Sequence, residues 1–196
     1  EIGMCPVRAL RVAYTGELGW ELHHPIEMQN YLLDILLSSG KEFNLKLVGA
    51  RAQNWLRQEK SYKAFGSDLG RDAGPFESKL SRFVDINKNF LGKDALLKRK
   101  TDVSCVTLLI DGPKDIDPWG REALYNETEE VMLGRLTSAG YSVHFKRSIG
   151  IGYVKSSFSE VGTKLRIKID DAFWNAEIVR DSPYDPQNER IIDRAQ

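Results

Sequence analysis

The fold is decided first by the stretch YTGELGWEL, residues 14–22. Gly16 and Gly19 bracket a tight connection inside it, and apolar and aromatic residues stand on both sides of that connection. Glycines between two such runs are typical of a β-hairpin. We therefore expect one strand over residues 7–14 and a second over residues 20–23, with Glu17 at the tip.

Helices are expected downstream of this hairpin. Apolar residues recur at spacings of three and four over residues 27–39, which predicts an amphipathic helix. A second helix is expected over residues 50–60, where it would bury Trp55 and Leu56. A short third helix over residues 93–100 has a basic end, which suits a helix C-terminus.

The rest of the chain has a β-rich pattern. Short runs of β-branched and apolar residues span residues 103–110, 131–137, 149–154, 165–169 and 173–179. Turn residues separate these runs, a spacing typical of a small antiparallel barrel or sandwich. The expected fold class is therefore α+β. A partial domain over residues 1–100 would combine an antiparallel sheet with helices, and residues 101–196 would form a separate β domain.

Composition excludes several functions. Twenty-eight Lys and Arg balance 28 Asp and Glu, so no global charge favours nucleic acid. The sequence contains no apolar run of about 18 residues, so no membrane segment is predicted. Cys5 and Cys105 lie far apart, so reduced thiols are expected and a metal site is not. The chain begins at Glu1 rather than Met, which is the start expected of a piece of a longer protein.

Glu17 is the first candidate for ligand chemistry. A carboxylate held between two glycines at a hairpin tip can accept paired hydrogen bonds from adjacent N–H donors of a ligand. A pterin offers such a pair through its ring N–H and its amino group. The alternative is that Glu17 is a solvated turn residue. The residues alone leave both interpretations open.

Arg57 is the second candidate. It could anchor an anionic or carbonyl-bearing ligand, or it could be solvated, since Arg57 and Glu59 at positions i and i+2 face different sides of a helix. The tryptophans are expected mainly in the core, although Trp20 is near enough to Glu17 in sequence to stack on a ligand.

Five ordered motifs resemble the glycine-cleavage T-protein (aminomethyltransferase) family. They are YTGELGWEL (14–22), LRQEKSY (56–62), FLGKDAL (90–96), GRLTS (134–138) and IGIGYV (149–154). The ending SPYDPQNER (182–190) is similar to the tail of sarcosine-dehydrogenase-like chains. The resemblance therefore favours the branch of the family that is fused to dimethylglycine and sarcosine dehydrogenases.

This resemblance implies the C-terminal part of the T-protein folate-binding fold, followed by a small antiparallel β-barrel. It implies tetrahydrofolate as cofactor, with its pterin held by Glu17, and with Arg57, Tyr14 and Trp20 in the same folate site. In the family, tetrahydrofolate captures a methylene group released from a secondary or tertiary amine. The expected function is that of the folate-binding C-terminal region of a dimethylglycine- or sarcosine-dehydrogenase-like enzyme.

The resemblance also implies what lies outside this chain. The catalytic aspartate of the family belongs to an N-terminal region that the chain lacks, and FAD would belong to a missing N-terminal domain. No catalytic residue is therefore assigned, and the chain alone is expected to be inactive. Gln58 and Ser61 replace the Leu and Gly of the family motif.

Two alternatives follow from the same resemblance. One is a free-standing aminomethyltransferase of the glycine cleavage system, and the other is a non-catalytic regulatory subunit similar to that of pyruvate dehydrogenase phosphatase. The expected partners are a small-molecule folate and either the missing N-terminal domain or a lipoyl carrier protein, with no nucleic acid and no membrane. The expected compartment is the cytoplasm or the mitochondrial matrix.

Overall fold

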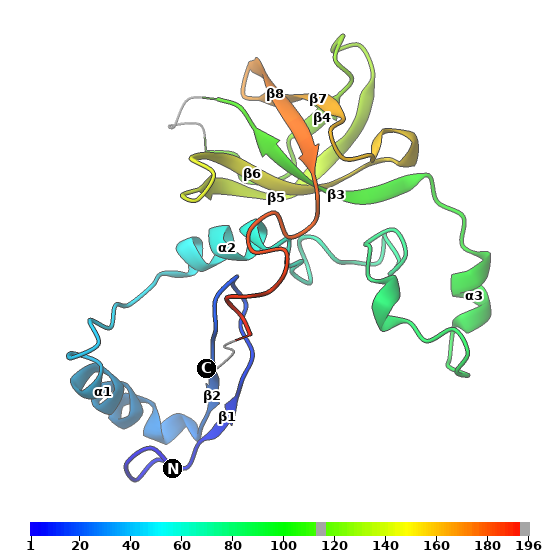
Figure 1. Cartoon of the computed structure of the whole chain (residues 1–196). Helices are drawn as coiled ribbons and strands as arrows, with labels where there is room; N and C mark the ends of the chain where they lie inside the picture. The colour runs from blue at the N-terminus through cyan, green and yellow to red at the C-terminus, as the bar shows by residue number, and fades with distance from the viewer. Residues whose placement is uncertain (113–116, 193–196) are drawn as a thin grey trace.

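The computed structural model describes residues 1–112 and 117–192. A β-barrel forms one end of the molecule, and helices, a hairpin and long loops extend from beneath it (Figure 1). The helices are α1 (Gln29–Ser39), α2 (Ala50–Glu59) and α3 (Lys93–Lys98). The strands are β1 (Arg8–Leu10), β2 (Glu21–His23), β3 (Val103–Ile110), β4 (Ala123–Tyr125), β5 (Met132–Ser142), β6 (Arg147–Lys155), β7 (Lys164–Ile169) and β8 (Ala172–Val179).

The hairpin predicted from residues 14–22 is present. Strands β1 and β2 pair in antiparallel register, with Arg8 opposite His23 and Leu10 opposite Glu21. The paired segment is shorter than expected, and a long connection over residues 11–20 joins the two strands. A two-stranded sheet has little buried surface with which to extend its pairing. The long connection carries Glu17.

Both helices that follow the hairpin are confirmed, but the buried face of α2 is not the expected one. Leu56 is 37% exposed and Trp55 is half-buried, whereas Arg57, Gln58 and Glu59 are buried. The prediction that α2 buries Leu56 is therefore wrong. The helix turns polar side chains toward β5, which supplies polar partners such as the Ser138 hydroxyl at 2.8 Å from an Arg57 nitrogen. Satisfied polar groups can be buried at little net cost.

The C-terminal half forms a closed antiparallel barrel rather than a sandwich. Its strands follow the order β3-β6-β5-β4-β7-β8. Alternate residues point inward and form one apolar core, whose members include Val106, Leu108, Leu124, Leu136, Val154, Ile167 and Ile178. Full closure leaves no unpaired edge strand. The three-residue strand β4 was not predicted, because its pairing with β5 is interrupted by a register shift and its local pattern is short.

Two glycines allow β5 and β6 to approach each other closely. A Cβ atom at Gly134 would collide with the Tyr153 carbonyl group, at 2.8 Å from its carbon, and would lie 2.8 Å from the Cα of Val154. A Cβ atom at Gly152 would lie 2.9 Å from the Cα of Leu136. Real Cβ atoms do not approach backbone atoms this closely, so these positions require glycine.

The cysteines and tryptophans test two further expectations. Cys5 and Cys105 are free, as expected, and both are buried; burial raises the pKa of the Cys105 thiol to about 12. Trp174 packs on the barrel core. Trp20 and Trp119, however, are 58% and 77% exposed, so the expectation that they are core residues is wrong.

The described residues contain no group of three or more His, Cys, Asp or Glu side chains arranged to hold a metal ion. Among the same residues, no helix combines the length and apolarity needed to cross a bilayer. The predicted division near residue 100 falls between α3 and β3 and stays a prediction.

Candidate functional site

Glu17 lies against the C-terminal segment of the chain, residues 182–192. The Tyr184 hydroxyl donates a hydrogen bond to its Oε1 atom, and the Arg190 guanidinium lies 3.5 Å from the same oxygen. The hydrogen bond to Glu17 is the main reason that the pKa of Tyr184 is raised. The Glu17 side chain is still half exposed. Its Oε2 atom has no hydrogen-bond partner among residues 1–112 and 117–192, so this oxygen can accept from a ligand.

Tyr14 stacks with Tyr62, which follows α2 in the chain. Their ring centroids lie 6.3 Å apart with an interplanar angle of 19°. Burial is the main cause that raises the pKa of each phenol, so both remain neutral near pH 7. The pair forms a flat, apolar wall near the hairpin connection.

Arg57 is buried and makes most of its hydrogen bonds with the protein itself. Its side chain is 3% exposed and donates to the Asn54 side chain, the Tyr62 carbonyl oxygen, the Asp68 carboxylate and the Ser138 hydroxyl. The idea that Arg57 is a solvated helix residue is therefore wrong. Four of the five guanidinium donors have protein partners, so Arg57 fixes the backbone at Tyr62.

Asp68 completes the same cluster. Its carboxylate lies 2.7 Å from an Arg57 nitrogen, is fully buried, and accepts hydrogen bonds from the Ala64 backbone N–H and from the hydroxyls of Thr137 and Ser138. The cluster thereby joins α2, the loop after it and strand β5. Sequence reasoning missed Asp68, because its partner in β5 lies 70 residues away in the chain.

The end of α2 also holds the C-terminal segment. The buried Lys60 ammonium donates to the backbone carbonyl oxygens of Tyr184 and Asp185 and lies 3.5 Å from the Asp185 carboxylate. The Ser182 hydroxyl donates to the Lys60 carbonyl oxygen, and the Ser182 N–H donates to the Ser61 hydroxyl. These contacts place Tyr184 and Arg190 beside Glu17.

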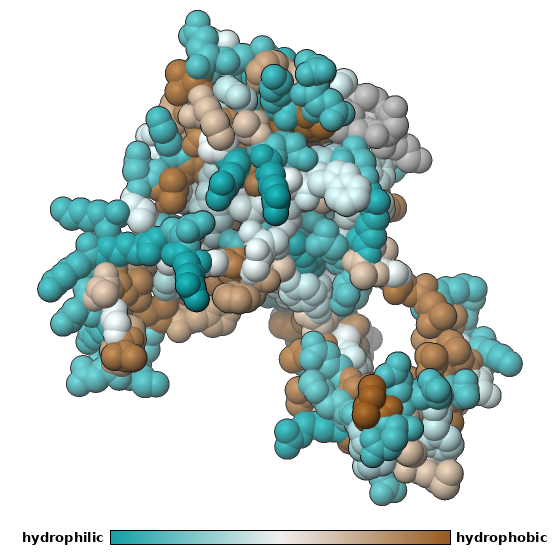
Figure 2. Space-filling model, turned by 180° about the vertical axis from the view of Figure 1, so that it is seen from behind, coloured by the Kyte–Doolittle hydropathy of each residue, from teal (hydrophilic) through white to brown (hydrophobic). Residues whose placement is uncertain are grey.

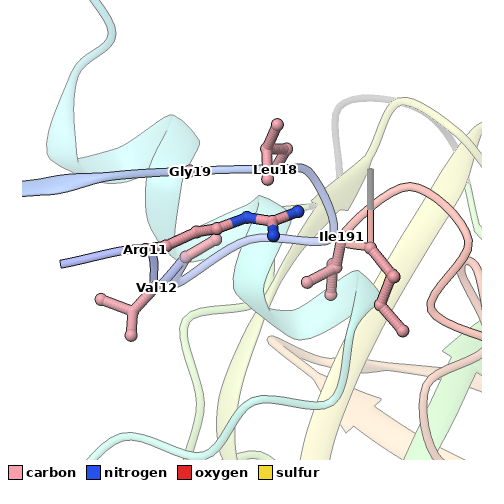
Figure 3. A pocket seen from close by; sticks show the side chains of 7 residues that line it. Arg11, Val12, Leu18, Gly19 and Ile191 are labelled. Atoms are coloured by element: carbon pink, nitrogen blue, oxygen red, sulfur yellow. The ribbon is translucent and has the colours of Figure 1, made fainter. Parts of the chain in front are cut away.

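A small cavity of about 220 Å³ lies between the hairpin and this C-terminal segment. Figure 3 shows the Arg11 side chain extending from one arm of the hairpin toward Ile191, with Leu18 and Gly19 on the other arm. The C-terminal segment, through Ile191 and Ile192, closes one side of this cavity.

The structure brings the predicted site residues together only in part. Arg57 donates to the carbonyl oxygen of Tyr62, and the ring of Tyr62 stacks with Tyr14. Glu17 instead contacts Tyr184 in the C-terminal segment, which docks on α2. No ring–ring or cation–ring contact involves Trp20 in the described part of the chain. Tyr184 and Arg190 were missed because no local pattern links residue 184 to residue 17.

Acid should weaken the docking of the C-terminal segment. Burial alone would raise the pKa of Asp185, but the backbone N–H groups of Arg190 and Glu189 and the Lys60 ammonium outweigh it and lower that pKa below 3.8. Burial likewise acts to raise the pKa of Glu77, but hydrogen bonds from Thr101 and Arg99 outweigh burial and hold that pKa below its ordinary value. Lowered carboxyl pKa values stabilise the folded state above the ordinary pKa, and this stabilisation is lost as the pH falls through the folded value.

We therefore expect the contribution of these two groups to the free energy of unfolding to be constant from pH 8 to about pH 5 and to fall below about pH 4. The measurement is urea unfolding as a function of pH. Asp185→Asn should lower stability at pH 7 and reduce its acid sensitivity. Equal acid sensitivity in the variant and the wild type would contradict this role of Asp185.

Comparison with known proteins gives the wider relationship. The family model described as the GCVT N-terminal domain matches residues 1–88, and the glycine cleavage T-protein C-terminal barrel domain matches residues 104–185. Dimethylglycine dehydrogenase from Mus musculus is 37% identical over 90% of this chain and 20% of its own length. Aminomethyltransferase from Caldanaerobacter subterraneus subsp. tengcongensis is 32% identical over 86% of this chain and 45% of its own length.

The fold agrees with a solved structure of the same kind. The crystal structure of glycine cleavage system aminomethyltransferase T from Bartonella henselae matches 90% of this chain and 49% of its own chain, with a TM-score of 0.79 and 23% identity. This chain thus spans less than half the length of these relatives. The two family models follow each other along the chain, and the resemblance found in the five sequence motifs is confirmed. The chain belongs to the glycine cleavage T-protein family.

Proposed function

We propose that this chain is the tetrahydrofolate-binding C-terminal region of a dimethylglycine- or sarcosine-dehydrogenase-like enzyme, which passes a methylene group from an amine to tetrahydrofolate. The observation that carries the proposal is Glu17, a half-exposed carboxylate on the hairpin connection whose Oε2 atom has no partner among the described residues. The similarity to dimethylglycine dehydrogenase over 90% of the chain supports the choice of branch.

The residues present fit a pterin. Its ring N–H and amino group are adjacent donors, and a carboxylate with one free oxygen can accept from them. The stacked pair Tyr14 and Tyr62 offers a flat wall for an aromatic ring. The exposed indole of Trp20 offers a second such surface. Tetrahydrofolate would supply the nitrogen atoms that accept the one-carbon group.

Arg57 has a different part in this proposal. Because four of its N–H groups donate to protein atoms, Arg57 acts as a positioning residue: it fixes the Tyr62 backbone and thereby the ring of Tyr14 that stacks with Tyr62. FAD and the catalytic aspartate of the family would lie in other parts of a longer polypeptide. The chain on its own is therefore proposed to be inactive.

The surface supports a contact with such further parts. Figure 2 shows apolar residues gathered on the lobe that the hairpin and α1 form, at the lower right of that view. Exposed apolar side chains of this lobe include Leu10, Val12, Leu18, Trp20, Ile26 and Leu33. Apolar surface of this kind marks an interaction site. We propose that the N-terminal domain of the longer protein covers it.

A free-standing aminomethyltransferase, which would work with a lipoyl carrier protein, is the second candidate. The similarity to the Caldanaerobacter aminomethyltransferase over 86% of the chain favours it. The sequence that precedes Glu1 in the intact polypeptide distinguishes the two, since only the dehydrogenase branch carries a flavin domain there. The proposed compartment is the mitochondrial matrix or the cytoplasm, and the mouse relative is mitochondrial.

Glu17→Gln in the intact protein should weaken tetrahydrofolate binding by about 1.5–3 kcal/mol, because it replaces the anionic acceptor of a charged hydrogen bond. Calorimetric titration of the wild type and the variant measures this difference. Tyr184→Phe is the matched control, because it removes the hydrogen bond to the C-terminal segment and keeps the carboxylate. If both variants bind equally weakly, Glu17 only holds that segment. If neither variant changes the affinity, Glu17 is not part of the folate site.

A further inference from the structure

A larger groove of about 900 Å³ lies between the loop after α2 and the barrel, and no residue of the hairpin lines it. One wall is the glycine-rich loop over residues 66–73, and the other is the turn formed by Trp119, Gly120 and Arg121. The outward faces of β5 and β6 form the floor, where Arg135 lies opposite Tyr153 in the antiparallel register. The proposed folate site does not use this groove.

Two arginines bring uncompensated positive charge to the groove. The backbone N–H of Arg121 donates to the Leu136 carbonyl oxygen, which places Arg121 next to Arg135 on β5. Neither guanidinium has a hydrogen bond or an ion pair with any residue of the described ranges. Among the described residues, two carboxylates line the groove: Asp68 is neutralised by Arg57, and the exposed Asp72 has no ion-pair partner there. The balance favours an anionic ligand.

Trp119 is held in place beside these charges. The Glu122 carboxylate accepts hydrogen bonds from the backbone N–H groups of Trp119 at 2.8 Å and of Gly120 at 2.9 Å, and fixes the turn. The Arg51 guanidinium lies 5.3 Å from the ring of Trp55 and 5.1 Å from the ring of Trp119, so it is shared by the two indoles. Trp119 is nevertheless largely exposed. A fixed, exposed indole is a surface on which a planar ring can stack.

Backbone strain accompanies this turn. Arg121 adopts a φ of 91°, in the left-handed region that side-chain-bearing residues rarely occupy. Gly120, with a φ of 98°, lies so close to β5 that a Cβ atom would be 2.7 Å from the Thr137 carbonyl oxygen. The turn is thus pressed against the barrel in a conformation that directs Trp119 and Arg121 into the same groove. Strain of this kind gathers at ligand-holding sites.

We propose that this groove binds a small organic anion that carries a planar ring. Arg121 and Arg135 would hold its phosphate or carboxylate group, the ring would stack on Trp119, and Asp72 would accept a hydrogen bond from an N–H or O–H group of the ligand. The volume of the groove lies in the range of roughly 300–1,000 Å³ that suits small ligands. Phosphate and carboxylate share the chemistry that two guanidinium groups recognise.

Calorimetric titration of the intact protein tests this inference with five probes. Adenosine monophosphate and benzoate each combine a ring with an anion, whereas inorganic phosphate, acetate and adenosine each lack one of the two. We expect adenosine monophosphate to bind more tightly than phosphate and adenosine, or benzoate more tightly than acetate, by at least about tenfold. A preference for adenosine monophosphate would identify the anionic group as phosphate, and a preference for benzoate would identify it as carboxylate. If adenosine monophosphate binds no more tightly than phosphate and adenosine, and benzoate no more tightly than acetate, the inference is overturned.

Variants assign the binding to this groove. Arg121→Gln and Arg135→Gln should each weaken the preferred ring-bearing anion by at least about tenfold. Trp119→Ala should weaken the ring-bearing anion and leave the ring-free anion unchanged. Arg180→Gln is the matched control, because Arg180 is an exposed arginine beyond β8 that does not line the groove. An equal loss with Arg180→Gln, or no loss with both groove variants, would overturn the inference.

Discussion

Asp68→Ala should destabilise the protein by about 3–5 kcal/mol, because it leaves the Arg57 guanidinium buried without its counter-ion. Both side chains are almost completely buried, so water cannot replace the lost carboxylate. The substitution also removes the acceptor of the Ala64 N–H and of the Thr137 and Ser138 hydroxyls. Urea unfolding measures the loss.

Asp72→Ala is the control for this prediction. Asp72 lies in the same loop but its side chain is exposed, so its replacement should change stability by less than about 0.5 kcal/mol. Arg57→Met combined with Asp68→Leu should cost less than the sum of the two single changes, because the double variant leaves no unpaired buried charge. A loss below 1 kcal/mol for Asp68→Ala would contradict the view that this pair joins α2 to the barrel.

Gly134→Ala should cost about 3 kcal/mol, near the upper end of what overpacking usually costs. The new methyl group would meet backbone atoms of Tyr153 and Val154 on β6, and backbone atoms cannot rotate out of its way as a side chain could. Relief would require β5 and β6, which are neighbours in the closed barrel, to separate where Gly134 lies opposite Val154. Thermal or urea unfolding of the variant measures the effect.

Gly70→Ala is the matched glycine control, because a Cβ atom there would meet nothing within 4 Å. Its effect should stay within about 0.5 kcal/mol of zero. If Gly134→Ala were as well tolerated as Gly70→Ala, the close approach of β5 and β6 would not be a requirement of the barrel.

The parts of the fold that could be predicted from sequence are those with a strong local pattern. The glycines at 16 and 19 indicate the hairpin, and the spacing of apolar residues over 27–39 indicates α1. Five of the barrel strands have runs of β-branched and apolar residues. Each of these signals depends on neighbouring residues only, which is why each can be recognised without knowledge of the tertiary structure.

The parts that could not be predicted depend on partners far away in the chain. The buried polar face of α2 follows from acceptors on β5, such as Ser138, which lies 81 residues from Arg57. An apolar-face rule therefore selects the wrong side of α2, because hydrogen bonds and an ion pair offset the burial of its polar residues. The short strand β4 depends on its neighbours β5 and β7 rather than on its own three residues.

The candidate site shows the same contrast. Glu17 stands out in sequence because two glycines bracket it, whereas Tyr184 reaches it across 167 residues and Asp68 supports Arg57 through the fold. Sequence therefore identified an acid on the hairpin connection. The structure adds the C-terminal segment, which occupies one of the Glu17 oxygens, and within the part of the chain that the structure describes the other oxygen has no partner.

The most direct test of the central claim is a crystal structure of the intact protein with bound tetrahydrofolate. We expect a pterin nitrogen to lie at hydrogen-bonding distance, about 2.7–3.2 Å, from the Glu17 carboxylate. We also expect the pterin to lie beside the ring of Tyr14. A pterin bound away from the hairpin, with Glu17 still held by Tyr184 and Arg190, would show that Glu17 does not bind folate.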